Sequence, residues 1–205
     1  FVIGPFGGFE TPNVNQNAGE TARGVTITKN GTTTHIPIVY GYRRVGGSIV
    51  FAETNGSNNK YLYVCYVLAQ GEIEGVRRLF VDDVEIPTAM MTGRNNTLPA
   101  GAEIIPPSGR YKNLVRMQMF NGASGDAQSS LLNGSNSWSN KTRTIPGVAY
   151  LAMRYEFPEV KTQEDADNNP FKGGIPAIQA EILGKRVFNV ASLNAQRNLN
   201  KSQSM

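Results

Sequence analysis

The sequence predicts a mainly β protein with one or two short helices, of the β-rich α+β class, in which antiparallel sheets or β-barrel-like domains are joined by long loops. Of its 205 residues 40% are hydrophobic and only 18% charged, with 22 glycines and 11 prolines, whereas helical proteins are richer in Ala, Glu, Lys and Leu. Runs of β-branched and aromatic residues recur at strand length. Glycine and asparagine pairs, which are typical of turns, separate these runs.

Residues 61–86 show this pattern most clearly, and the rest of the predicted fold is organised around them. The run from Tyr61 is aromatic and β-branched, and Gly71 and Gly75 then bracket two glutamates. We predict two strands of one antiparallel unit that meet at this tight corner. Asp82-Asp83 predicts a turn into a short third strand, and the corner glutamates are expected to point to solvent.

The remaining elements follow from the same rules. Asn30-Gly31 predicts a hairpin over 25–36, which places His35 on a strand near an edge. The pair Gly46-Gly47 predicts a turn with positive φ between strands at 38–44 and 48–53. Further strands are expected where Val115, Met117 and Met119 alternate with polar residues, at 147–157 with both faces buried, and as a last pair at 177–182 and 186–188.

A helix is predicted over 124–132, capped by Ser124 or Asp126 and stopped by Asn133-Gly134. Trp138 follows in a polar stretch, where it serves either as a lid over the edge of the core or as an intersubunit anchor, with the lid favoured.

Three regions are expected along the chain. Residues 1–24 form an extended N-terminal arm, 25–188 form the β-rich region, and 189–205 form a polar linker or tail. A sub-boundary near 87–110 stays open, because the later strands can pack back on the earlier ones. The chain starts without methionine and ends abruptly, so we expect it to be part of a longer protein.

Several classes of function are disfavoured by the residue inventory. The single cysteine, Cys65, excludes an internal disulfide and a cysteine-cluster metal site, and its apolar neighbours predict a buried, inert thiol. His35 is the only histidine, which weakens zinc or histidine-based acid–base chemistry. The net charge of +4 is spread over isolated pairs, so no dedicated nucleic-acid site is expected. No apolar run is long enough to span a membrane, and we expect no cofactor.

Three blocks in order resemble the N-terminal part of the central tail hub, or tail tip, protein of long-tailed bacteriophages (the lambda J-like family). The blocks are 36–41 with 44–47; 69–75 with 81–83; and 147–151, preceded by Trp138 and followed by 174–176 and 182–188. Family members usually continue into a longer hub, which 189–205 do not support, and residues 1–24 match no part of the family. These terminal departures leave room for a docking arm at 1–24.

The resemblance implies a β-rich hub domain, or domains, at 25–188 and a homotrimer around the tail axis. It implies contacts with the distal tail or tube protein, the C-terminus of the tape measure protein, and other tail tip and fibre proteins that carry host attachment. It also implies a structural virion protein of the baseplate region, made in the bacterial host cytoplasm, with no enzymatic activity. The candidate intersubunit or structural residues are Gly46, Gly47, Gly71, Gly75, Trp138, Phe6 and Phe9.

Two other functions remain as alternatives. A receptor- or carbohydrate-binding domain of a tail fibre would use the loop aromatics Phe6, Phe9 and Trp138 to stack on sugar rings. A hydrolase would pair Glu72 with Glu74, whose separation at a corner the sequence does not fix. Asp82-Asp83 as a metal site is disfavoured, because adjacent carboxylates at a turn are usually solvated.

Overall fold

The computed structural model describes residues 35–87, 96–139, 144–171 and 175–187. The predicted hairpin at Asn30-Gly31, the arm at 1–24 with Phe6 and Phe9, and the linker at 189–205 lie outside these residues. His35 is described. It is exposed and belongs to no strand, so the prediction of an edge strand at this position was wrong.

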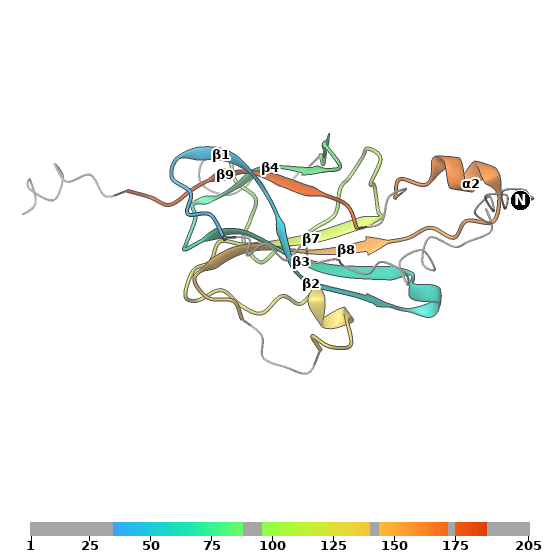
Figure 1. The fold of residues 1–205 in the computed structure, drawn as a ribbon, viewed down its shortest axis with the longest axis horizontal. Coiled ribbons are helices and arrows are strands. Elements are labelled where there is room, and N and C mark those ends of the chain that lie inside the picture. Colours follow the sequence, from blue (N-terminus) through green and yellow to red (C-terminus); the bar gives the residue numbers. More distant parts are fainter. Residues whose placement is uncertain (1–34, 88–95, 140–143, 172–174, 188–205) are drawn as a thin grey trace, which may run out of the picture.

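Two antiparallel sheets make up the described part of the chain, and Figure 1 shows them as two layers. The smaller sheet has the order β1 (Tyr42–Gly46), β9 (Ile178–Leu183), β4 (Gly75–Val81) and β5 (Val84–Glu85). The larger sheet has the order β2 (Ser48–Asn55), β3 (Tyr61–Gln70), β8 (Val148–Glu156), β7 (Val115–Phe120) and β6 (Glu103–Ile104). The helical segments are α2 (Gln163–Asn168) and the 3-10 turns η1 (Ser57–Asn59) and η2 (Leu132–Gly134).

These sheets confirm the mainly β class with short helices and long loops. Over the described residues both sheets are open, each ending in two unjoined edge strands, so the barrel-like form is not adopted. Both sheets also take strands from either side of residues 87–110.

The chain passes repeatedly from one sheet to the other, which the sequence analysis did not foresee. Strands β3 and β4 were predicted to pair across the Gly71–Gly75 corner, but they lie in different sheets. Likewise β1 and β2 do not form a hairpin, and neither Gly46 nor Gly47 has a positive φ. Gly47 instead allows close approach, because a Cβ there would lie 2.9 Å from the Cβ of Tyr66.

The main core lies between the sheets and follows the period-two alternation of the strands. Val115, Met117 and Met119 face it as predicted, and each is fully buried. The even-numbered side chains of β3, such as Val64 and Leu68, face it too.

A second core covers the other face of the larger sheet. Its members are Tyr63, Cys65, Phe120, Leu132, Trp138, Tyr150 and Ala152. Because β3 and β8 contribute alternate residues to the two cores, both strands are buried on both faces, which confirms the expectation for β8 and explains its continuous apolar run.

The helix prediction was wrong in position. Residues 124–131 form no helix, because the Asp126 carboxylate turns back to accept hydrogen bonds from the backbone N–H groups of Gly122 and Ala123. The helix α2 lies instead in a charged stretch after β8, where no helix was predicted. There Thr162 and Asp165 form a capping box that satisfies exposed N–H groups at the start of the helix.

The predicted last strand pair was half right. β9 forms, but Arg186 and Val187 are not in a strand, and Lys185 makes only an isolated parallel bridge with Tyr40. Gly184 makes this bridge possible, because a Cβ at this position would collide with the carbonyl of Val39.

Candidate functional site

The corner between β3 and β4 is built from converging backbone segments. The N–H of Gly71 donates to the carbonyl of Gly147 at 2.7 Å, and the N–H of Gly147 donates to the carbonyl of Gly122 at 3.2 Å. The N–H of Ile73 donates to the carbonyl of Asn121 at 2.9 Å, and the buried Ile73 side chain joins the main core. The corner is therefore anchored to the loop after β7 and to the start of β8.

The glycines at this corner are fixed by geometry. Gly71, Gly122 and Gly147 have positive φ values of 85°, 82° and 73°, a region that L side chains rarely adopt. At Gly122 space is also lacking, since a Cβ would lie 2.8 Å from backbone atoms of Gly71, Val148 and Ala149. Of these three glycines, only Gly71 was among the residues predicted from the sequence.

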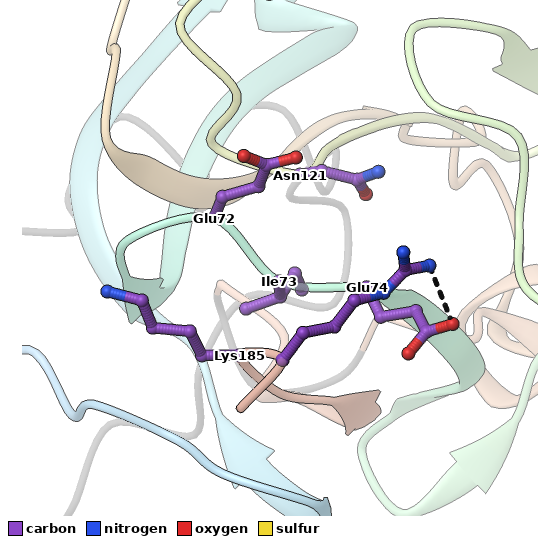
Figure 2. A pocket seen from close by; sticks show the side chains of 6 residues that line it. Glu72, Ile73, Glu74, Asn121 and Lys185 are labelled. Carbon is purple, nitrogen blue, oxygen red and sulfur yellow. Dashed lines mark hydrogen bonds and ion pairs between the residues drawn. The ribbon is translucent and has the colours of Figure 1, made fainter. Parts of the chain in front are cut away.

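A cleft of about 380 Å³ opens beside this corner (Figure 2). Its lining residues are Glu72, Ile73, Glu74, Asn121, Lys185 and Arg186. The carboxylate of Glu74 forms an ion pair with Arg186 at 2.9 Å, whereas Glu72 extends on the side of Asn121 and away from Glu74. The two carboxylates do not face a common point, so the structure does not assemble the acid pair that a glycosidase needs.

Asp82 and Asp83 form a tight turn with φ values of 47° and 62°. The carboxylate of Asp82 accepts a hydrogen bond from the N–H of Ala177 at 2.8 Å, and that of Asp83 accepts one from Gln179 at 2.7 Å. Both carboxylates therefore hold the turn against β9 and the residue directly before it. Within the described ranges, no group of three or more His, Cys, Asp or Glu residues could hold a metal ion.

Trp138 lies in the second core and is only 5% exposed. Its ring meets that of Phe51 edge to face, with the centroids 5.1 Å apart. A ring buried in this way offers no open face for stacking on a sugar. Whether Trp138 also contributes to a contact between subunits stays a prediction.

The other described glycines among the predicted residues lie at two of the places where the chain changes sheets. Gly46 and Gly47 join β1 to β2, while Gly71 and Gly75 flank the cleft. A Cβ on Gly75 would lie 2.7 Å from the Cβ of Thr97. Their role between subunits stays a prediction, as does that of Phe6 and Phe9, which lie outside the described residues.

The protonation of the only thiol in the sequence is governed by its burial. Cys65 is fully buried in the second core, and burial raises its pKa to about 12. The neutral thiol is therefore the form present at physiological pH, which suits a packing role.

Charged groups are paired across the outer face of the smaller sheet. Arg78 forms ion pairs with Glu85 and Glu181, and the hydroxyl of Tyr42 hydrogen-bonds to Glu181. The Arg44 guanidinium stacks over Phe80, 3.7 Å from the ring centroid. This face is polar and locally satisfied, as one side of an antiparallel sheet can be.

An apolar stripe, defined as Ile36, Ile38, Tyr40 and Tyr42, departs from this pattern. The four side chains are 36%, 56%, 57% and 50% exposed. No sequence-based prediction covered the stripe, although the alternation of Ile36, Ile38 and Tyr40 around the buried Val39 was its visible signal.

No helix in the described part of the chain has the length and apolarity needed to cross a membrane.

Comparisons with known proteins found similarity to a phage protein and to a chain of a solved particle. No protein-family model matches it. Among curated proteins, baseplate hub protein pb3 of Escherichia phage T5 is 26% identical over 191 residues, covering 74% of this chain and 19% of the relative. The chain thus corresponds to only part of that relative. Among solved structures, a chain from the virion of a native gene transfer agent particle aligns with 78% of this chain and 29% of its own length, at 16% identity and a TM-score of 0.48. At that TM-score the likeness does not establish a shared fold.

Proposed function

We propose that this chain is a structural component of a bacteriophage tail, part of the baseplate or tail tip hub. The observation that carries the proposal is the sequence similarity to a phage baseplate hub protein over most of the chain. The resemblance to lambda J-like hubs at residues 36–188 supports the same assignment. Within this proposal, three copies surround the tail axis, close the tail tube, and connect it to the tape measure protein and the host-recognition parts.

The construction of the domain fits a role in holding other chains. Two strands, β3 and β8, are buried on both faces and carry two cores, so the centre of the domain is closely packed. At the corner the Glu74 carboxylate is paired with Arg186, and at the Asp82-Asp83 turn both carboxylates accept hydrogen bonds from groups of the same chain. We therefore propose that the chain acts by assembly, without an enzymatic reaction.

The test is the composition and structure of the particle. Mass spectrometry of purified virions should find the chain in an integer ratio to the other tail proteins, and a map of the tail should place three copies around its axis. Purified particles that lack the chain would refute the proposal. A different copy number would refute the threefold arrangement alone.

The carbohydrate-binding alternative loses one of its three aromatics, because Trp138 is enclosed in the second core. Its remaining candidates, Phe6 and Phe9, lie outside the described residues. Binding of the isolated chain to a glycan, abolished by Phe6→Ala or Phe9→Ala, would favour this alternative.

A further inference from the structure

The proposed ring imposes a requirement on the surface of the chain. Copies related by a threefold axis meet through two different patches, one on each side of the contact, because only a twofold contact is self-complementary. The chain should therefore carry two complementary patches that lie apart from one another. The described surface offers one such pair.

The first patch is the apolar stripe together with the cations beside it. The Arg77 guanidinium lies over the Tyr42 ring, 5.6 Å from its centroid, and Lys185 is paired through its backbone with Tyr40. Four exposed apolar side chains along one short segment form a larger apolar surface than scattered single residues do, and such rows commonly mark protein contacts. This patch is thus apolar, with the cations Arg77 and Lys185 beside it and the Glu181 carboxylate bound to the Tyr42 hydroxyl.

The second patch is acidic and surrounds α2. Residues 159–169 contain one cation, Lys161, and four acidic residues, Glu159, Glu164, Asp165 and Asp167. Glu164, Asp165 and Asp167 are exposed, whereas Ala166 between them is half-buried. Figure 1 shows α2 at one end of the long axis of the molecule and the start of β1, with the segment that leads into it, at the other. The two patches have opposite charge and lie at opposite ends.

We propose that the apolar stripe of one copy, with Arg77 and Lys185, binds the α2 end of a second copy in a head-to-tail contact. This proposal rests on the proposed hub function and names the surfaces that the ring would use. The opposite charges fix which end meets which, and the stripe supplies the apolar area that the contact buries. Two stripes facing each other would instead bring their cations together, which disfavours a twofold contact.

Cysteine cross-linking of the full chain tests the contact directly. The native Cys65 is fully buried with a raised pKa, so it does not compete for a thiol-specific bifunctional reagent. Ile38→Cys and Asp167→Cys chains should cross-link to each other when mixed, and neither should cross-link to itself. Val50→Cys, on the similarly exposed Val50 of β2, is the matched control and should cross-link with neither.

Each other outcome overturns the proposal. Self-linking of Ile38→Cys would show a twofold contact through the stripe. Association of the wild-type chain without cross-linking between the two sites would place the contact elsewhere. A monomer at every concentration, by light scattering, would exclude the contact in the chain.

Charge reversal separates the proposed contact from a general effect on folding. Arg77→Glu with Lys185→Glu, or Glu164→Lys with Asp167→Lys, should each weaken self-association roughly tenfold or more, since like charges then face each other. Combining all four changes restores opposite charges across the contact and should restore association. A combined variant no better than either pair would contradict the proposal. The presence of the wild-type chain in virions is measured separately, so the hub function can hold even if this contact fails.

Discussion

Replacing Gly122 by alanine should lower the free energy of unfolding by about 3 kcal/mol, from two effects that the structure separates. The first is backbone strain, because Gly122 has a φ of 82°; for an L residue the left-handed region costs roughly 1–2 kcal/mol. The second is crowding, since the new methyl group would lie 2.8 Å from backbone atoms of Gly71, Val148 and Ala149. Backbone cannot rotate away as a side chain can, so this overpacking adds roughly 1–3 kcal/mol. The lower entropy of the unfolded alanine chain offsets about 0.4–1 kcal/mol of the sum.

Two other glycines of the same region serve as matched controls. Gly147 has a φ of 73° but open space around its Cβ position, so Gly147→Ala should show strain alone and cost about 1 kcal/mol. Gly125 is exposed, has no positive φ and has open space, so Gly125→Ala should change the stability by less than about 0.5 kcal/mol or raise it slightly.

The assay is urea unfolding followed by the fluorescence of Trp138, which is buried in the second core. The expected order of stability is Gly125→Ala, then Gly147→Ala, then Gly122→Ala as the least stable. Equal losses for Gly122→Ala and Gly147→Ala would refute the argument that converging backbones, and not only a positive φ, require glycine at this corner.

Three further predictions test the cores and the pH dependence. Met117→Ala should cost about 2–5 kcal/mol in urea unfolding, because it leaves a cavity between the sheets, whereas Met117→Leu should cost less than about 1.5 kcal/mol; similar losses would argue against tight packing there. Gln118→Ala should speed proteolysis in the loop before η2, because the Gln118 carboxamide accepts hydrogen bonds from the Ser129 hydroxyl and the N–H of Leu131; unchanged cleavage would contradict this. The native Cys65 thiol should resist alkylation at pH 8 and react on unfolding, and its contribution to stability, complete below the ordinary pKa of 9.0, should be lost as the pH rises from there toward about 12. A Cys65→Ala variant with the same stability profile above pH 9 would assign that loss to other groups.

Local residue patterns predicted the strands well, because the order of apolar and polar residues along a strand reflects which of its two faces are buried. The alternation of Val115, Met117 and Met119 reports one buried face, and the unbroken apolar run of β8 reports two. The same patterns do not show which strands belong to the same sheet. Sheet membership depends on long-range pairing, such as that of β4 with β9, which no local pattern encodes.

The errors at turns and helices have local physical causes. Gly46-Gly47 resembles a hairpin turn, yet the glycine at 47 is needed for the approach of Tyr66 while the chain changes sheets. The short helix α2 has no apolar periodicity, so its only sequence signal was the spacing of Thr162 and Asp165 in the capping box. At the candidate site, the sequence located Gly71 and Gly75 but not Lys185 or Asn121, which reach the cleft only through the fold.

The residues that stabilise the domain differ from those proposed to join its copies, and this difference makes the two roles separable. Gly122 and Met117 lie in the corner and the core, whereas the apolar stripe and α2 lie at the two ends of the molecule. Gly122→Ala should therefore lower stability but leave the association of the chains that remain folded unchanged. Reversal of Lys185 should weaken association with little change in the urea midpoint, because its side chain is exposed and no ion pair joins it to another described residue. If both variants changed both properties to the same degree, the proposed contact would be part of the folding core, and the head-to-tail arrangement would have to be abandoned.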